Sequence, residues 1–483
     1  MAETTSEPKI TIPKVVIPLP DIQFLVQRKN ELELNSFCDK DYKITKESFP
    51  VNGEYQDVSW SPNGQYCILT TPTKVDIVNV EENKLQYTLN IERVYLTHIS
   101  PLSTFLLLWS KFNGKDNNLF VYTLATGELH TSYIQKTMTK QKWPCIQWTD
   151  DEELAARQTT ERCIVHNGHD LTLPSTAFIK IPAGSFVGMS PVSKDNCILV
   201  YTPSAKGSSS SLLQYKRSNN YIRSFNVYNE HRSTYIEYHF NKEGTLCICL
   251  LKNDLDKTGS SYYGTCTPLY INLYVRTTVN LSRPEATLSA CSWNPKGDKF
   301  ICIYNTRPAT AYVYNEDNTL HFAIPAGIYN DLVWSPHSRY VALTGFGNLS
   351  GDIQIYDIYK KKLLGRCQYK STSTLYWSAS SKYIYLCTSF LRMKVDNNWT
   401  ILKYNCKQIY NQKEDCLLSV TSRPRVPDFY PIRAVSPRGK QETKDGELNK
   451  EKKKEKWVPP SLRNQMNKGI PGLSPSLQQK QIK

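Results

Sequence analysis

A short unit of apolar and polar positions recurs along the chain. Each copy has an apolar run, a short polar turn, and a second apolar run rich in Ile, Leu, Val, Tyr and Cys. Clear copies are "DVSWSPNGQYCIL", "ACSWNPKGDKFICIY", "DLVWSPHSRYVAL" and "TLYWSASSKYIYL", and looser ones include "THISPLSTFLLL" and "VGMSPVSKDNCILV". Such a pattern predicts two antiparallel strands joined by a tight turn.

The spacing of this unit predicts the fold. One residue stands directly before the turn of each of eight copies, and the intervals between these anchors run from 39 to 53 residues. That period is typical of a β-propeller, in which each blade has four strands. The anchors are Trp60, Ile99, Trp148, Met189, Phe240, Trp293, Trp334 and Trp377.

The copy around Trp60 shows a whole blade. We expect strands at 55–60, 65–70, 74–80 and 85–89, because each range is rich in apolar, β-branched or aromatic residues. The turn "SPNG" between the first two strands has suitable chemistry, since Pro fixes φ and Gly accepts a positive φ.

The number of blades depends on the ends of the repeat. Strand-like segments also occur outside the eight units, as "DIQFLVQ" before them and as "WTILKYN" and "CLLSVTS" after them. Together they could form one more blade and remove the free sheet edges. The prediction is therefore an all-β, nine-bladed propeller at 1–420, with eight blades as the alternative, followed by a disordered basic tail at 421–483.

Long connections are predicted to gather on one face of the propeller. In antiparallel blades, the connection between the second and third strands emerges at the same end as the crossover to the next blade. Four of these connections are long, at 110–118, 202–210, 252–268 and 345–351. Recognition residues commonly lie on such loops. The candidate residues of this polar, nearly neutral face are Asp256, Lys257, Tyr262, Tyr263, Phe346 and Asn348.

The C-terminal tail carries most of the excess positive charge. Residues 421–483 hold 15 Lys/Arg and 6 Asp/Glu, a net charge of +9, whereas the whole chain has +15. This composition cannot form a packed core, but it can neutralise the phosphates of RNA, and a Trp can stack on bases. The candidate contacts, in "EKKKEKWVPPSLRN", are Lys452, Lys453, Lys454, Lys456, Trp457 and Arg463. A solvating tail and a Trp457 folded back on the propeller are the alternatives.

No constellation for catalysis, metal or cofactor binding emerges. The chain lacks a P-loop, a G-x-S-x-G element and a C-x2-C pair. The segment "VHNGHD" predicts a turn with solvent-facing His166 and His169. Many of the 14 cysteines lie inside apolar runs, as small buried side chains do. We therefore expect a reduced, cytoplasmic, monomeric protein that is not an enzyme and has no membrane span.

Three segments resemble a known family. "NDLDKTGSSYYG", "LTGFGNLSGDIQIYDI" and "KWVPPSLRNQ" are similar to sequences of the eukaryotic translation initiation factor 2A family, and their order agrees as well. The resemblance implies a nine-bladed propeller with a flexible basic tail. It also implies delivery of initiator methionyl-tRNA to the small (40S) ribosomal subunit, dependent on the codon and independent of GTP.

The resemblance has one departure. Family members typically continue past the "PPSLR" element into a long Lys/Glu-rich helical region, whereas this sequence stops about twenty residues after Arg463. The resemblance also implies mRNA and other initiation factors as partners, but their contacts would depend on the region that this sequence does not include. The leading hypothesis is a ribosome-associated initiation factor, and the alternative is a non-catalytic scaffold for protein–protein interactions in translation.

Overall fold

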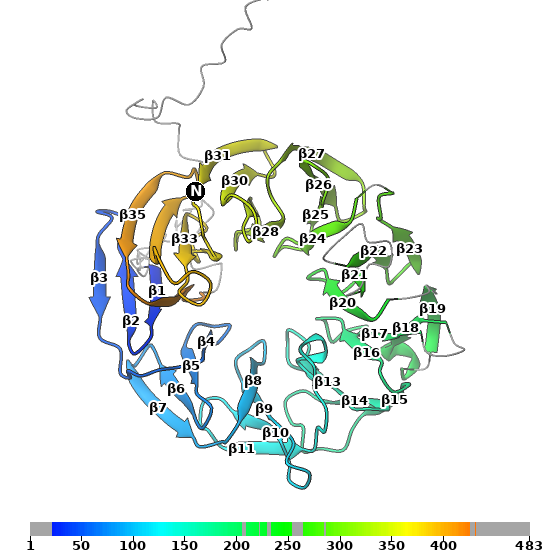
Figure 1. Cartoon of the computed structure of the whole chain (residues 1–483). Coiled ribbons are helices and arrows are strands. Elements are labelled where there is room, and N and C mark those ends of the chain that lie inside the picture. The colour runs from blue at the N-terminus through cyan, green and yellow to red at the C-terminus, as the bar shows by residue number, and fades with distance from the viewer. Residues whose placement is uncertain are drawn as a thin grey trace, which may run out of the picture. The chain divides into compact units, whose positions relative to one another are not determined.

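The computed structural model describes residues 22–204, 209–221, 223–228, 233–253, 264–284, 286–425 and 430. Within these residues the chain forms nine four-stranded antiparallel sheets. The sheets stand radially around a common axis, as the blades of a propeller do (Figure 1). The predicted all-β, nine-bladed propeller is confirmed, and the alternative of eight blades is wrong.

Eight blades are each built from four consecutive strands, called a to d from the axis outward. Blades 1 to 4 consist of β4 (Asp57–Trp60), β5 (Tyr66–Thr70), β6 (Val75–Asn79) and β7 (Lys84–Leu89); β8 (Val94–Ile99), β9 (Phe105–Ser110), β10 (Leu119–Thr123) and β11 (Leu129–Tyr133); β12 (Ile146–Trp148), β13 (Leu154–Gln158), β14 (Arg162–Asn167) and β15 (Ala177–Lys180); and β16 (Phe186–Met189), β17 (Cys197–Thr202), β18 (Ser211–Lys216) and β19 (Arg223–Tyr228).

Blades 5 to 8 repeat the same plan. They consist of β20 (Tyr235–Phe240), β21 (Leu246–Asn253), β22 (Thr265–Asn272) and β23 (Thr277–Asn280); β24 (Leu288–Trp293), β25 (Lys299–Tyr304), β26 (Ala309–Asn315) and β27 (Leu320–Gly327); β28 (Asp331–Trp334), β29 (Tyr340–Gly345), β30 (Asp352–Asp357) and β31 (Lys362–Gln368); and β32 (Thr374–Trp377), β33 (Tyr383–Thr388), β34 (Asn398–Lys403) and β35 (Gln408–Lys413). Two short 3-10 helices, η1 (Lys140–Lys142) and η2 (Arg217–Asn219), lie in connections.

Each of the eight anchor residues ends an a strand, as the repeat predicted. The tight a–b turn that follows needs a left-handed residue at its fourth position. Gly64 has φ +71°, and Ser103, Ser338 and Ser381 take the same role with φ of 68°, 60° and 56°. The serines also accept hydrogen bonds from the preceding blade's turn, for example from the backbone N–H of His337 to Ser381 Oγ at 3.0 Å.

The anchor tryptophans connect neighbouring blades near the axis. Trp293, Trp334 and Trp377 each donate their indole N–H to a backbone carbonyl of the preceding a strand, at 2.9, 3.3 and 3.0 Å. The accepting residue always stands one position before that strand's anchor, for instance Ser292 before Trp293. The repeated Trp therefore satisfies its polar atom while its ring fills the space between blades.

Strands from both ends of the chain form the closing blade. Its order is β3 (Ile44–Glu47), β2 (Leu32–Phe37), β1 (Ile22–Arg28) and β36 (Leu417–Ser422), with β36 nearest the axis. The expectation that "DIQFLVQ" and "CLLSVTS" meet in one blade is confirmed. The expectation for "WTILKYN" is wrong, because this segment lies in β34, the c strand of blade 8.

A short strap after β36 holds the closing blade against blade 1. Arg423 is only 3% exposed and donates to Gly64 O at 2.6 Å, to Gln23 Oε1, and to Glu81 Oε1 at 3.4 Å. The strap passes so close that a Cβ on Gly64 would lie 2.0 Å from the carbonyl oxygen of Pro424. Because β36 runs to Ser422, the propeller strands extend past position 420.

The core lies between the blades. Between the closing blade and blade 1, for example, the buried side chains of Leu25, Leu34, Cys67 and Leu69 pack together. Nine of the 14 cysteines are buried and all 14 are free thiols. The prediction of a solvent-facing His166 is wrong, because this side chain lies in β14 and is 6% exposed, whereas His169 is exposed in the following turn.

Candidate interaction face

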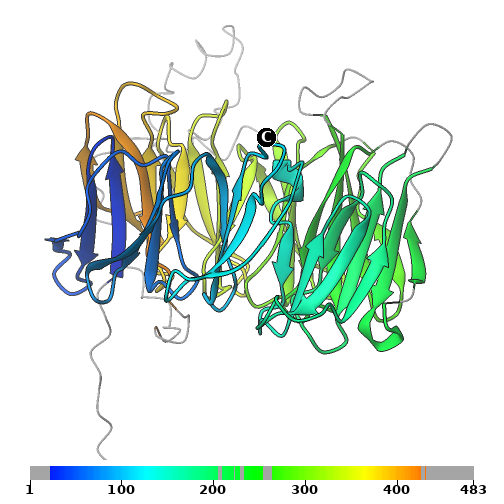
Figure 2. The same cartoon turned by 90° about the horizontal axis from the view of Figure 1, so that it is seen from below.

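The b–c loops and the d–a crossovers emerge on one face of the propeller, called the b–c face below, while the a–b and c–d turns form the opposite face. Figure 2 shows the blades from the side, with connections projecting at both ends of the strands. Of the four long b–c loops predicted from the sequence, those at 111–118 and 346–351 are fully described. Their positions after β9 and β29 agree with the predicted clustering of long loops.

The predicted face residues are only partly described. Phe346 and Asn348 lie in the loop after β29, where Phe346 is half-buried and Asn348 is exposed. The carbonyl of Phe346 accepts a hydrogen bond from Asn330 Nδ2 at 3.1 Å, which ties the loop to the crossover between blades 6 and 7. Asp256, Lys257, Tyr262 and Tyr263 lie outside the described residues.

The six tail candidates also lie outside the described residues. They are Lys452, Lys453, Lys454, Lys456, Trp457 and Arg463. Their roles remain predictions from the sequence.

A groove of about 890 Å³ opens on the b–c face over blades 5, 6 and 7. It collects side chains and backbone from the ends of β21, β25 and β29 and from the crossovers between these blades. The residues at its rim include Phe346's neighbours Gly347, Asn348 and Leu349. The lining contains many Asn, Thr and Ser groups and no carboxylate among the described residues. The residues that line the groove include Lys252, Asn305, Arg307, Ile328, Asn330 and Asn348.

The charge of this groove is positive. Lys252 is engaged by Glu237, with Nζ and Oε2 2.6 Å apart, so it adds little net charge. The nearby His239, 3.8 Å away, and the hydrogen bond from Lys252 lower the pKa of Glu237 to about 2 against the opposing effect of burial. Arg307 stands exposed at the b–c turn of blade 6, and no carboxylate in the described part of the chain pairs with it. The groove can therefore hold a neutral or anionic ligand through hydrogen bonds.

Sequence reasoning missed one long b–c loop. It joins β33 to β34 at 389–397, "SFLRMKVDN", and presents Leu391 and Val395 with 81% and 63% of their surface exposed. Its Arg392 lies beside Gly347 of the neighbouring loop, so the two loops are adjacent. The distance in sequence between "YIYLCT" and "WTILKYN" indicates this loop once "WTILKYN" is placed in β34, the c strand of blade 8.

The described residues hold no group of three or more His, Cys, Asp or Glu side chains placed to bind a metal ion. None of the helices in these residues is long and apolar enough to cross a membrane.

The chain is similar to known proteins over most of its length. The family described as "Eukaryotic translation initiation factor eIF2A" matches residues 229–420. Proteins named eukaryotic translation initiation factor 2A from Dictyostelium discoideum and Schizosaccharomyces pombe are 26% and 27% identical over 92% and 77% of this chain. The aligned chain spans 72% and 65% of those two relatives.

A solved structure agrees with the fold. "Crystal structure of the eukaryotic initiation factor" superposes with a TM-score of 0.73 and 23% identity, covering 84% of this chain and 99% of the other. At this identity the likeness supports the propeller architecture.

Proposed function

This chain belongs to the eukaryotic translation initiation factor eIF2A family, and from that membership we propose a specific role for it. It is a non-catalytic initiation factor that binds the small (40S) ribosomal subunit. There it directs initiator methionyl-tRNA to the start codon without GTP.

The observation that carries the proposal is the family match over residues 229–420 of the propeller, together with the loop-rich b–c face. A closed propeller is a rigid platform, and its loops can dock on a large partner without rearrangement. The groove with Arg307 and the adjacent loops at 346–351 and 389–397 provide a polar to basic surface suited to ribosomal RNA or protein.

The basic tail is proposed to hold the tRNA. Residues 421–483 carry a net charge of +9, so phosphate contacts there would add affinity that falls as salt rises. Lys452, Lys453, Lys454, Lys456 and Arg463 would contact phosphates, and Trp457 would stack on a base or fill a protein groove. The setting is the cytoplasm, with the chain acting as a monomer.

The test is a reconstitution with purified components. Small subunits, labelled initiator methionyl-tRNA and a short RNA with an AUG codon are mixed with the full chain, and the mixture is run on a sucrose gradient without nucleotide. We expect tRNA in the subunit peak only when both the chain and AUG are present. A requirement for GTP, or equal binding with a UUU codon, contradicts the proposed mechanism.

A truncation separates the parts. It should remove Arg433–Lys483, a unit distinct from Met1–Ile432, because a cut at 421 would remove the end of β36 and the buried Arg423. We expect the truncated chain to sediment with the subunit but to carry much less tRNA. Undiminished tRNA delivery by the truncated chain would refute the role of the tail.

The second candidate function is a scaffold for proteins of the translation machinery. The groove over blades 5 to 7 and the exposed Leu391 favour it, since an apolar side chain beside a polar groove is typical of a protein-docking surface. For a scaffold, the chain remains at the top of the gradient when only small subunits and tRNA are supplied.

A further inference from the structure

A second surface on the b–c face combines unpaired positive charge with an exposed aromatic ring. It lies on blade 2 and on the crossover from blade 2 to blade 3, away from the groove described above. We call it the blade 2 track and define it by Tyr95, Lys111, Lys115, Lys136, Lys140 and Lys142.

We propose that the blade 2 track binds single-stranded RNA, with Tyr95 stacking on a base and the lysines neutralising phosphates. The inference deepens the proposed function by naming an RNA surface on the propeller itself. The biological setting of the inference rests on the proposed function, but RNA binding by the blade 2 track can be measured without ribosomes.

Tyr95 is presented by a distortion of the sheet. The pairing of β8 with β9 shifts between Val94 and Leu96, so Tyr95 is the extra residue of a β-bulge. A bulge re-aims its side chain away from the regular ladder. The ring is 60% exposed and lies 6.1 Å, centroid to centroid, from the ring of Trp109.

A rigid frame supports this aromatic pair. Trp109 donates its indole N–H to Gln135 O at 3.2 Å. Asn118, which is 3% exposed, donates to Ser110 O at 2.8 Å and to Gln135 O at 3.0 Å. The loop, the b strand and the crossover are thus fixed together, so little conformational entropy is lost when a ligand binds.

The positive charge follows the path of the chain across the face. Lys111 and Lys115 stand on the b–c loop, and Lys136, Lys140 and Lys142 stand on the crossover at 134–145, which contains no acidic residue. This crossover runs inward until η1 lies against β20 of blade 5. No carboxylate among the described residues forms an ion pair with these lysines.

The acidic residue of the loop at 111–118 is held by hydrogen bonds within that loop. Asp116 is the one carboxylate of the loop at 111–118, and its Oδ2 accepts a hydrogen bond from Asn113 Nδ2 at 2.9 Å. Asn113 Oδ1 in turn accepts the backbone N–H groups of Lys115 and Asp116, at 3.0 and 2.9 Å. The loop is therefore a closed turn whose lysines project into solvent, available to an anionic partner.

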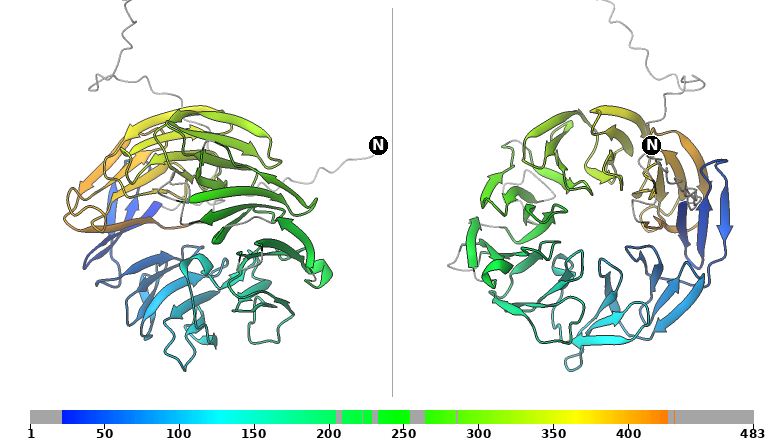
Figure 3. Two further views of the ribbon diagram at one scale, coloured as in Figure 1. Left: turned by 45° about the vertical axis from the view of Figure 1, so that its right-hand side comes forward. Right: turned by 180° about the vertical axis from the view of Figure 1, so that it is seen from behind.

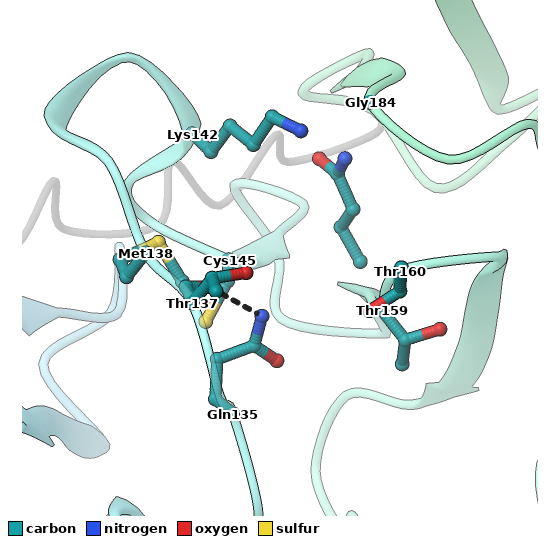
Figure 4. Close-up of a pocket in the computed structure, with 9 residues that line it drawn as sticks. Gln135, Thr137, Met138, Lys142, Cys145, Thr159, Thr160 and Gly184 are labelled. Atoms are coloured by element: carbon teal, nitrogen blue, oxygen red, sulfur yellow. Dashed lines mark hydrogen bonds between the residues drawn. The ribbon is translucent and has the colours of Figure 1, made fainter. Parts of the chain in front are cut away.

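A cavity of about 210 Å³ borders the inner end of the track (Figure 4). Lys142, Gln135 and Gln158 line it together with Thr159 and Thr160. Lys142 Nζ also lies 4.8 Å from the centroid of the Phe186 ring. Amide, hydroxyl and ammonium groups are the partners that the edges of an unpaired base can use.

These features favour single-stranded RNA over other polyanions. Only an unpaired base can stack on an exposed ring, whereas a duplex or a lipid headgroup would use the charges alone. The basic tail of the chain itself is not the occupant, since residues 421–483 have a net charge of +9. An acidic protein segment would bind through the lysines without a contact to Tyr95, and the experiment below distinguishes it from RNA.

The experiment compares matched variants of the full chain. Lys111→Gln/Lys136→Gln/Lys140→Gln removes three charges from the track. Lys194→Gln/Lys242→Gln/Lys360→Gln removes three exposed lysines from the a–b and c–d turns of the opposite face. Binding of a labelled 12-nucleotide oligouridine is followed by fluorescence anisotropy over a salt series.

We expect the track variant to lower the slope of log K against log salt by about 2, because each phosphate contact on a single strand adds about 0.7. At 0.1 M salt this is a weakening of about a hundredfold. The control variant should keep the wild-type slope. Equal loss in both triple variants would show that only the net charge of the chain matters and would overturn the proposal.

Tyr95→Ala tests the stacking, with Tyr274→Ala as its control because Tyr274 is 62% exposed on a c–d turn. We expect at least about fivefold weaker oligouridine binding for Tyr95→Ala and no change for Tyr274→Ala. If the track variant loses binding to phosphatidylserine vesicles or to an acidic peptide but not to oligouridine, the RNA assignment is wrong.

Photo-cross-linking of the wild-type chain to a 4-thiouridine oligonucleotide removes any dependence on variants. We expect cross-links at 93–111 and 134–145, and cross-links confined to the tail would overturn the proposal. A chain that binds oligouridine through the track but fails to sediment with small subunits would refute the proposed function while leaving this inference intact.

Discussion

The strap at Arg423 should decide whether the propeller stays closed. β36 pairs with β1 although Val420 and Val26 are nearly four hundred positions apart in the sequence. Arg423 follows this strand directly and reaches blade 1 through Gly64 O and Glu81 Oε1. Its replacement by Ala removes these bonds and leaves the backbone of β36 unchanged.

The magnitude follows from the partners that are left behind. Gly64 O loses a charged donor in a buried setting and Gln23 Oε1 loses one in a half-buried setting, and each such loss costs about 1–3 kcal/mol. Glu81 is 51% exposed, so its ion pair adds little, about 0–1 kcal/mol. Burial lowers the pKa of Arg423 to about 10, which shows that holding the charge inside has its own cost and reduces the net effect. We expect Arg423→Ala to destabilise the closure by about 3 kcal/mol.

Hydrogen exchange with mass spectrometry measures this locally, because a large propeller need not unfold in one step. About 3 kcal/mol corresponds to roughly hundredfold faster exchange of the amides in β36 and β1. Strands of blade 5, far around the ring (Figure 3), should keep their protection.

The control is Arg425→Ala, whose partner is the same half-exposed Glu81 at 3.1 Å. It should change exchange in β36 less than tenfold. Unchanged exchange in Arg423→Ala, or a uniform increase over all nine blades, would refute the idea that the strap is a local latch.

Three further predictions concern the remaining structure. Burial lowers the pKa of His98 from 6.5 to about 4. Burial and the nearby charge of Arg157 lower the pKa of His166 from 6.5 to about 4 as well. The free energy of unfolding is therefore highest above pH 6.5 and falls as the pH drops toward 4, by about 2 kcal/mol per histidine at pH 5. In urea titrations, the double variant His98→Gln/His166→Gln should lose less stability between these pH values than the wild-type chain. A variant whose stability depends on pH as strongly as that of the wild type would contradict this. Trp334→Phe removes the indole bond to Ser292 O and should raise exchange at the boundary of blades 6 and 7 about fivefold, whereas no local change would mean that the bond adds nothing. Ellman's reagent should leave the nine buried thiols of the native chain unreacted and reach all 14 only after denaturation, and rapid reaction of all 14 in the native chain would argue against this core.

The blade repeat could be read from the sequence because its information is local. A Trp, a turn with Gly or Ser at the left-handed position, and a second apolar run stand within about a dozen residues in "DVSWSPNGQYCIL". Turn chemistry and strand alternation act over that distance, so all eight anchors were found at the ends of the a strands.

Other features depended on contacts between distant segments. Gln23 and Arg423 meet only when the ring closes, and no local pattern marks them as partners. The position of "WTILKYN" was misjudged because a buried c strand reads like any other apolar strand. Burial of His166 likewise depends on the neighbouring blade, whose Tyr133 ring lies 6.4 Å away.

Four features could be predicted from the residues alone: the all-β class, the blade period, the positions of the anchors and the excess of positive charge in the tail. The folded structure was needed to show that Arg423 ties the end of β36 to blade 1 and that the loop at 389–397 lies beside the loop at 346–351. Folding also places the bulged Tyr95 against Trp109 and joins the loop at 111–118 to the crossover at 134–145 through Gln135 O. The physical reason is that strand patterns arise from neighbours along the chain, whereas a binding surface arises from residues that folding brings together.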